Sequence, residues 1–162
     1  MSVRAARAED AGAIAAIWNP IIRETVVTFN SVEKTAEDVA ATITDRTLAG
    51  HGFWVATEGS ELVGFATYAQ FRGGIGYAHT MEHTIVLAPI AQGRGHGRAL
   101  MTALEDHARA RGVHSMFAGV SSGNPDGIAF HSALGYQEVS VLRQVGRKFD
   151  RWFDLHVMQK FL

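Results

Sequence analysis

The amino-acid sequence predicts a single domain of the mixed α/β class. Its length of 162 residues suits one ordinary domain, which can bury a full hydrophobic core. Segments with helically spaced apolar residues alternate with β-rich runs, in the order β-α-α-β-β-β-α-β-α-β-β. No linker, repeat or low-complexity tract divides the chain, so we expect one domain over residues 1–162.

The N-terminal part is predicted to form a short strand followed by two helices. The strand is Val3–Ala5. Residues Glu9–Ile22 are predicted to be helical because apolar side chains recur at helical spacing, at Ile14, Ile17, Trp18 and Ile21. The second helix, Thr35–Leu48, begins with Thr35 as its N-cap and Asp38 three residues later, a spacing close to a capping box.

The middle of the chain has the period of β-strands. Phe53–Thr57 and Leu62–Tyr68 are typical of a hairpin joined by the turn Glu58–Glu61. His79–Leu87 is a longer strand, and its unbroken apolar end predicts that both faces are covered there.

The C-terminal part returns to alternating helices and strands. Gly97–Arg111 has an apolar stripe and is followed by Gly112, which predicts a helix with a glycine C-cap. Ser115–Val120 is expected to be a buried strand, and Asn124-Pro125 begins a short helix with Asn124 as N-cap. Two final strands are expected at Tyr136–Val145 and Phe149–Met158.

The composition excludes several classes of protein. The chain has no cysteine, which rules out disulfides, cysteine nucleophiles and cysteine-based zinc sites. Its formal net charge of -1 provides no basic excess for binding nucleic acid. No apolar stretch is long enough for a membrane span, and the N-terminus lacks the pattern of a signal peptide. We therefore expect a cytoplasmic protein with no nucleic-acid or membrane partner.

The most informative segment is the glycine-rich loop Gln92–Arg98, between a predicted strand and a predicted helix. Glycines let the backbone approach a ligand closely, and free N–H groups at a helix start favour phosphate. Arg94 and Arg98 can add charge-assisted hydrogen bonds. The loop has no lysine for a P-loop, and Arg98 stands where a dinucleotide fingerprint needs glycine. The alternative interpretation is a plain strand-to-helix turn.

The pattern Gln92-x-x-Gly95-x-Gly97 resembles the acetyl-CoA pyrophosphate loop of the GCN5-related N-acetyltransferases (GNAT). Other segments resemble the phosphinothricin and methionine sulfoximine N-acetyltransferase branch, over essentially the whole chain: Thr28-Phe29, Phe71-Arg72, Tyr77–His83, Asn124–Tyr136 and Val145–Trp152. The resemblance implies a single α/β domain with a mixed central sheet, splayed fourth and fifth strands, and helices on both faces. It also implies acetyl-CoA as co-substrate; no metal is expected.

The resemblance assigns the cofactor contacts. The end of the fourth strand would pair with the pantetheine arm, the glycine-rich loop would hold the diphosphate, and a later asparagine would contact the arm. The residues concerned are Ile85, Val86, Leu87, Gln92, Gly93, Arg94, Gly95, His96, Gly97, Arg98 and Asn124. From the residues alone, a pure N-cap explains Asn124 equally well.

Acyl transfer to an amine needs a base, because an ammonium group must lose a proton before it attacks. Glu82 lies just before Ile85–Leu87 in a strand, where glutamate is uncommon. The resemblance makes it the general base, a buried acid beside the thioester; the alternative is a solvent-facing residue paired with an arginine. His79 and His83 flank it, but residues four apart in a strand are about 13 Å apart, too far to share a metal ion.

The general acid and the substrate contacts are less well defined. His131 stands where many superfamily members have a tyrosine that protonates the leaving thiolate, and histidine can donate near neutral pH. A helix-face histidine that only hydrogen-bonds cofactor or solvent is the alternative. The resembling enzymes acetylate small amino-acid-like molecules, which need a cation for the carboxylate and aromatic walls. The candidates are Arg72 as the clamp, Phe29 and Tyr77 as walls, and His79 and Thr80 beside them, whereas the helical stripe of Trp18 favours the core.

The terminal stretch Gly146–Trp152 carries three basic residues beside aromatics, Arg147, Lys148 and Arg151. We expect these charges to form a solvated face rather than a nucleic-acid site. The resemblance implies that this hairpin helps to form a homodimer whose partner completes the pocket.

The sequence therefore predicts an acetyl-CoA-dependent N-acetyltransferase that acetylates the α-amine of small substrates of the methionine sulfoximine, methionine sulfone or phosphinothricin type. Transfer would be direct, because no cysteine is present to hold the acyl group. Two alternatives stay open: the same chemistry on a protein N-terminus or polyamine, and a non-catalytic acyl-CoA-binding module.

Overall fold

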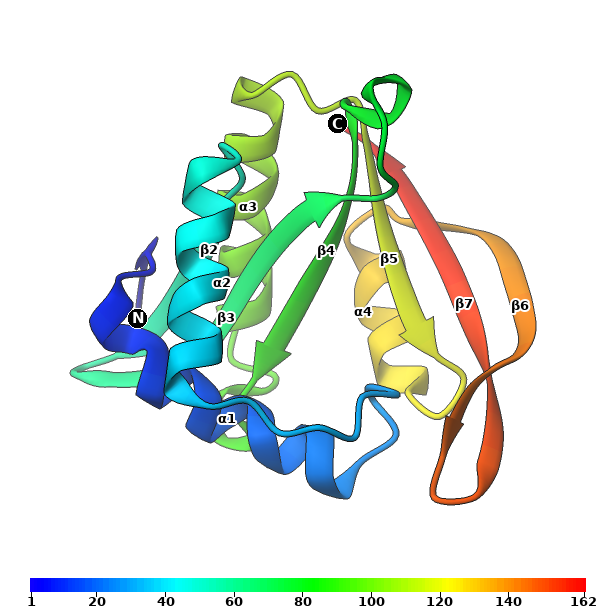
Figure 1. The fold of residues 1–162 in the computed structure, drawn as a ribbon, viewed down its shortest axis with the longest axis horizontal. Helices are drawn as coiled ribbons and strands as arrows, with labels where there is room; N and C mark the ends of the chain where they lie inside the picture. The colour runs from blue at the N-terminus through cyan, green and yellow to red at the C-terminus, as the bar shows by residue number, and fades with distance from the viewer.

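The computed structural model describes residues 1–162 and shows one seven-stranded mixed sheet with four α-helices (Figure 1). The elements are β1 Ser2–Ala5, α1 Ala11–Glu24, α2 Ala36–Leu48, β2 Phe53–Glu58, β3 Glu61–Gln70, β4 Thr80–Leu87, α3 His96–Ala110, β5 Ser115–Ser121, α4 Pro125–Ala133, β6 Gln137–Lys148 and β7 Arg151–Phe161. The strand order is β1-β2-β3-β4-β5-β7-β6, with only the β4–β5 pair parallel. No helix has the length and apolar character needed to cross a bilayer.

The sheet opens between β4 and β5 (Figure 1). The two strands pair only at their first residues, Thr80 with Ser115, Met81 with Met116 and Glu82 with Phe117. Beyond Glu82 the strands diverge while β4 stays paired to β3 along its whole length. The predicted splay is confirmed, and it leaves one edge of β4 without a partner strand.

Two hydrophobic clusters hold the sheet, one on each face. The larger packs α3 and α4 against the face that carries Met81 and Met116. The smaller packs α1 and α2 against the face that carries Phe65 and Val86. Because alternate residues of a strand face opposite sides, Glu82 and Thr84 lie on the α1–α2 side and His83 on the α3–α4 side.

Most predicted elements are present, with differences of one to three residues at their ends. The Thr35 cap is confirmed: its hydroxyl accepts from the N–H of Asp38 at 3.1 Å, and the Asp38 carboxylate accepts from the N–H of Thr35 at 2.8 Å. The last strand begins at Arg151 rather than Phe149, because Phe149 and Asp150 have φ angles of 51° and 57° and form a two-residue turn.

Candidate active site

A cavity of about 280 Å³ occupies the gap where β4 and β5 separate. Its walls come from both strands, from the second half of α1 and the loop that follows it, from Asn124 and His131 at α4, and from Leu155 on β7. It therefore joins the two faces of the sheet at the one place where the strands do not close against each other.

The edge of β4 that borders this cavity has free backbone groups. In an antiparallel ladder the N–H and C=O of one residue point to the same neighbour, and the direction alternates along the strand. The carbonyl of Thr80 accepts from Phe71 and the N–H of Ala88 donates to Val63, both on the β3 side. The backbone groups of Ile85 and Leu87 consequently point into the gap, where an extended ligand can pair with them as an added strand.

The glycine-rich loop presents six backbone N–H groups without an acceptor in the protein, those of residues 93 to 98. Gly93 and Gly95 have φ angles of +71° and +86°, and the space that a Cβ would enter at either is open. Helix α3 begins at His96, so the positive end of its dipole adds to these amides. The loop therefore fits a diphosphate group.

The side chains of this loop contribute less than its backbone. Arg94 forms a two-pronged ion pair with Glu58, at 2.8 and 2.6 Å, whereas Arg98 is exposed with no ion pair. The ring of His96 is buried in the protein, so only its backbone can face a ligand. At Gly97 a Cβ would stand 2.9 Å from the ring of Phe130, so this glycine is needed for packing of α3 on α4.

Glu82 lies where the two strands begin to separate, and its carboxylate takes part in no hydrogen bond or ion pair within the protein. An Oε atom stands only 3.4 Å from where a Cβ of Gly119 on β5 would be. The Glu82 side chain is exposed, so the expectation of a buried acid is wrong. Surrounding protein atoms nevertheless raise the pKa of its carboxyl by desolvation. An unpaired carboxylate of raised pKa suits proton abstraction.

His83 and His131 form a buried pair on the wall of the cavity. Their Nε2 atoms are 3.1 Å apart, and Nδ1 of His131 lies 2.7 Å from the carbonyl oxygen of Gly127. A carbonyl only accepts, so Nδ1 of His131 carries its hydrogen, and His83 donates to Nε2 of His131. Burial lowers the pKa of both rings, that of His83 to about 3, so both are neutral at pH 7. In this arrangement His131 directs no proton into the cavity.

The sequence profile described as "Acetyltransferase (GNAT) domain" matches residues 3–157. The chain belongs to the GNAT acetyltransferase family. The L-amino acid N-acyltransferase MnaT of Escherichia coli is 39% identical to it, over 98% of this chain and 92% of that protein. The L-methionine sulfoximine/L-methionine sulfone acetyltransferase of Salmonella typhimurium is 35% identical, over 98% and 93%. This GNAT protein is therefore an acyltransferase.

Solved structures agree with this assignment. An acetyltransferase of Salmonella typhimurium with its cofactor acetyl-CoA has a TM-score of 0.95 at 35% identity, covering 99% of this chain and 93% of that one. A phosphinothricin acetyltransferase of Sinorhizobium meliloti in complex with acetyl-CoA has a TM-score of 0.94 at 30% identity, covering 99% and 88%. The splayed sheet of this GNAT domain is thus a shared architecture.

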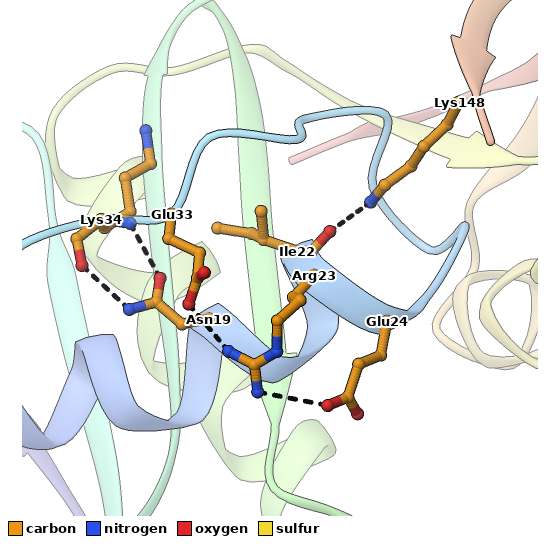
Figure 2. A network of polar contacts seen from close by, with 7 residues as sticks. All are labelled: Asn19, Ile22, Arg23, Glu24, Glu33, Lys34 and Lys148. Carbon is orange, nitrogen blue, oxygen red and sulfur yellow. Dashed lines mark hydrogen bonds and ion pairs between the residues drawn. The ribbon is translucent and has the colours of Figure 1, made fainter. Parts of the chain in front are cut away.

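Phe29 lines the GNAT cavity from the loop between α1 and α2, and the C-terminal hairpin holds this loop in place. The Phe29 ring stacks on Phe153 at 5.9 Å and covers Gly146, where any Cβ would lie 2.3 Å from ring carbons. Lys148 donates to the carbonyls of Ile22 at 2.5 Å and Thr28 at 2.9 Å, and Figure 2 shows its side chain reaching the last turn of α1.

The expected solvated face of the hairpin is therefore wrong for Lys148, which is only 4% exposed. The carbonyl end of α1 carries partial negative charge, which attracts the ammonium group. Arg147 and Arg151 are exposed, as expected, and lie over the rings of Trp152 and Phe153.

The structure separates the other predicted substrate contacts from the cavity. Arg72, Tyr77 and His79 are exposed on the segment between β3 and β4, with the Arg72 guanidinium over the Tyr77 ring at 5.6 Å. Thr80 is the first residue of β4. The N-cap interpretation of Asn124 is confirmed, because its Oδ1 accepts from the N–H of Gly127 at 3.0 Å. Asn124 also lines the cavity, and its contact with the cofactor arm stays a prediction. Trp18 packs on Phe65 at 4.9 Å and lines the cavity as well.

Sequence reasoning missed a second, smaller cavity of about 100 Å³ above β3 and β4. Glu82 and Thr84 line it from β4, and Arg46 from the last turn of α2. Thr84 also lines the larger cavity, so the two adjoin. No local signal marked Arg46, because a basic residue in the last turn of a helix is ordinary.

Proposed function

We propose that this acyltransferase moves the acetyl group of acetyl-CoA to the α-amine of small amino-acid-like substrates, of the methionine sulfone, methionine sulfoximine or phosphinothricin type. The main support is the unpaired carboxylate of Glu82, which lies where β4 and β5 begin to separate. The free amides of residues 93–98 lie beyond the other end of β4. Relatives with these activities match nearly the whole chain, which adds to the case.

The proposed chemistry assigns a task to each part of the cleft. The amides of residues 93–98 bind the diphosphate, and the open edge at Ile85–Leu87 aligns the pantetheine arm and donates an N–H to the developing oxyanion. Glu82 takes a proton from the substrate ammonium, directly or through water. The amine then attacks the thioester carbonyl, so that a C–N bond forms as the C–S bond breaks. The nitrogen gives up its second proton as the C–N bond forms, and this proton reaches the thiolate through water. Both ring nitrogens of His131 are held, by the Gly127 carbonyl and by His83, so His131 forms part of the cavity wall and is not proposed as the general acid.

The substrate side of the proposal rests on the loops around the cleft. Phe29 forms a wall of the cavity. The exposed segment with Arg72, Tyr77 and His79, followed by Thr80, would meet the substrate from the open side. Seven large apolar side chains are exposed on the β6–β7 hairpin, which favours a homodimer through this surface: Val139, Val141, Leu142, Val145, Phe149, Trp152 and Phe161. We also propose that the enzyme acts in the cytoplasm.

The deciding experiment measures release of free thiol with purified wild type and the Glu82→Gln variant. The panel contains methionine sulfone, methionine sulfoximine, phosphinothricin, ordinary amino acids, a polyamine and a peptide N-terminus. We expect turnover of the amino-acid-like amines, and a loss of about a hundredfold or more in kcat for Glu82→Gln, because the base is removed. Acetyl-CoA affinity, measured by calorimetry, should stay unchanged. Turnover confined to the polyamine or peptide, or unchanged rates in the variant, would contradict the proposal.

A further inference from the structure

The guanidinium of Arg46 forms no hydrogen bond within the protein. It is partly buried, it forms no ion pair, and its Nε is buried without any hydrogen-bond partner. It is the only arginine or lysine with such an orphaned donor. Burial also lowers the pKa of its guanidinium, which shows that the charge is partly desolvated. A buried donor without an acceptor destabilises the folded protein and calls for an explanation.

The cavity that Arg46 lines contains a complementary charge. Glu82 borders the same space of about 100 Å³, and its carboxylate is also without a partner. The guanidinium and this carboxylate are too far apart for an ion pair, although both line one small cavity. Two opposite charges held beside each other without contact suit a guest that carries both an ammonium and a carboxylate.

The remaining lining of this cavity is polar. The register of β3 and β4 places Thr67 opposite Thr84, and Ala69 opposite Glu82, on the face beneath α2. Thr67, Thr84 and Gln70 thus add hydroxyl and amide groups around the space between the two charges. Thr84 joins this cavity to the larger one, which places the guest's amine next to the cleft between the strands.

We propose that Arg46 binds the α-carboxylate of the acceptor, so that the smaller cavity is a subsite for the zwitterionic head group of an α-amino acid. The ammonium faces Glu82, and the carboxylate faces the guanidinium, whose planar fork matches a carboxylate. This inference rests on the proposed function, and it explains why the enzyme would select amino acids over other primary amines. It also differs from the expectation that Arg72, on the exposed segment, is the carboxylate clamp.

The test compares three acceptors that share one side chain: L-methionine sulfone, its carboxamide and its decarboxylated amine. The variants are Arg46→Met, Arg46→Lys, Arg72→Met and, as a matched control, Arg7→Met, which removes an exposed arginine outside both cavities. For Arg46→Met we expect kcat/KM with the acid to fall roughly 30- to 100-fold, and to change less than about threefold with the decarboxylated amine. Arg46→Lys should fall in between, because lysine keeps the charge but not the fork.

Several outcomes would overturn the inference. An equal loss on all three acceptors would mean that Arg46 supports only the fold, and no loss on the acid would place the carboxylate elsewhere. An acid-selective loss in Arg72→Met but not in Arg46→Met would assign the carboxylate to Arg72. If wild type releases no thiol with any amine, the proposed function fails instead. Calorimetry with L-methionine sulfone then tests the subsite: binding that is lost in Arg46→Met supports it, and equal or absent binding refutes it.

Discussion

The environments of two glutamates show how one residue type acquires opposite roles. Glu105 on α3 is more deeply buried than Glu82, yet its carboxylate accepts from Lys160 at 2.7 Å and from the hydroxyl of Tyr136 at 3.1 Å. Its charge is satisfied, so it stabilises the packing of α3 against the sheet. Glu82 has no such partner and a carboxyl pKa raised by desolvation. A partnerless acid can give and take a proton without first breaking a hydrogen bond, which is what a base requires.

The His83–His131 pair makes stability depend on pH in a defined direction. The pKa of His83 is lowered to about 3 in the folded protein, so the unfolded chain binds a proton first as the pH falls below about 6.5. The free energy of unfolding therefore decreases progressively as the pH falls from near 6.5 toward the pKa that His83 has in the folded protein. We expect the Tm of wild type to fall more between pH 7.5 and pH 5 than that of His83→Gln, measured by thermal melts. His114→Gln, at an exposed site, is the control, and a parallel decline in all three proteins would contradict the assignment.

At the scale of elements, one end of α3 and the tip of the β6–β7 hairpin each position a loop beside the cleft. The start of α3 supplies free amides to the loop, while its other end is closed by Gly112 at a φ of +80°. The hairpin tip anchors the loop with Phe29 through Lys148 and Gly146. In both cases a regular element positions a loop that borders the proposed ligand sites.

Replacing Gly95 by alanine should weaken the binding of acetyl-CoA by about tenfold. The residue has a φ of +86°, where a Cβ costs roughly 1–2 kcal/mol, and the added methyl group would enter the open side of the loop. Gly112→Ala imposes similar strain at the far end of the same helix and should lower Tm without changing affinity. Equal dissociation constants for the two variants in calorimetry would show that the loop does not bind the diphosphate.

Lys148→Met should raise the KM for the amine several-fold while leaving the affinity for acetyl-CoA unchanged. The substitution leaves the carbonyls of Ile22 and Thr28 without their donor, which costs about 1–3 kcal/mol and frees the loop with Phe29. Steady-state kinetics check the KM, and chemical denaturation checks the stability. Arg147→Met, one residue away but exposed, should match wild type in both. Loss of stability without any change in KM would mean that the loop keeps its position unaided.

Two features belong to the whole molecule: the cleft between β4 and β5, and the exposed apolar side chains of the β6–β7 hairpin. The cleft exists because β4 and β5 separate, and the surface exists because β6 and β7 extend beyond the part of the sheet that the helices cover (Figure 1). Exposed apolar side chains concentrated on one hairpin are typical of an interaction surface. The tip of that same hairpin anchors the Phe29 loop, so pairing of two chains there would also stabilise the substrate side of the cleft.

Sedimentation should therefore give a particle of twice the chain mass of 17.6 kDa. Val145→Glu, which places a charge on the exposed surface, should shift the protein toward monomer by burying an unpaired charge in any interface. Val32→Glu, at an exposed site outside the hairpin, should leave the mass unchanged. A monomeric wild type, or a dimer unaffected by Val145→Glu, would contradict the homodimer.

Features that depend on neighbours in the sequence were predictable. The Thr35 cap, the Asn124 cap, the glycine-rich loop before α3 and the order of the elements all follow from short-range preferences and periodicity. The position of Glu82 in a strand was also predictable, but its exposure was not, because exposure depends on which parts of the sheet the helices cover. The predicted start of the last strand was wrong, because Phe149 and Asp150 have positive φ angles and form a turn.

The sequence by itself therefore determined the class of fold, the glycine-rich loop that is expected to bind phosphate, and the candidate base, since each is encoded by residues close together in the chain. Only the tertiary structure decided that Lys148 is buried against Ile22, that His83 faces His131, and that Arg46 shares a cavity with Glu82. These contacts join residues from 36 to 126 positions apart. No local propensity specifies such a meeting, because it results from the packing of helices on a sheet that has opened between two of its strands.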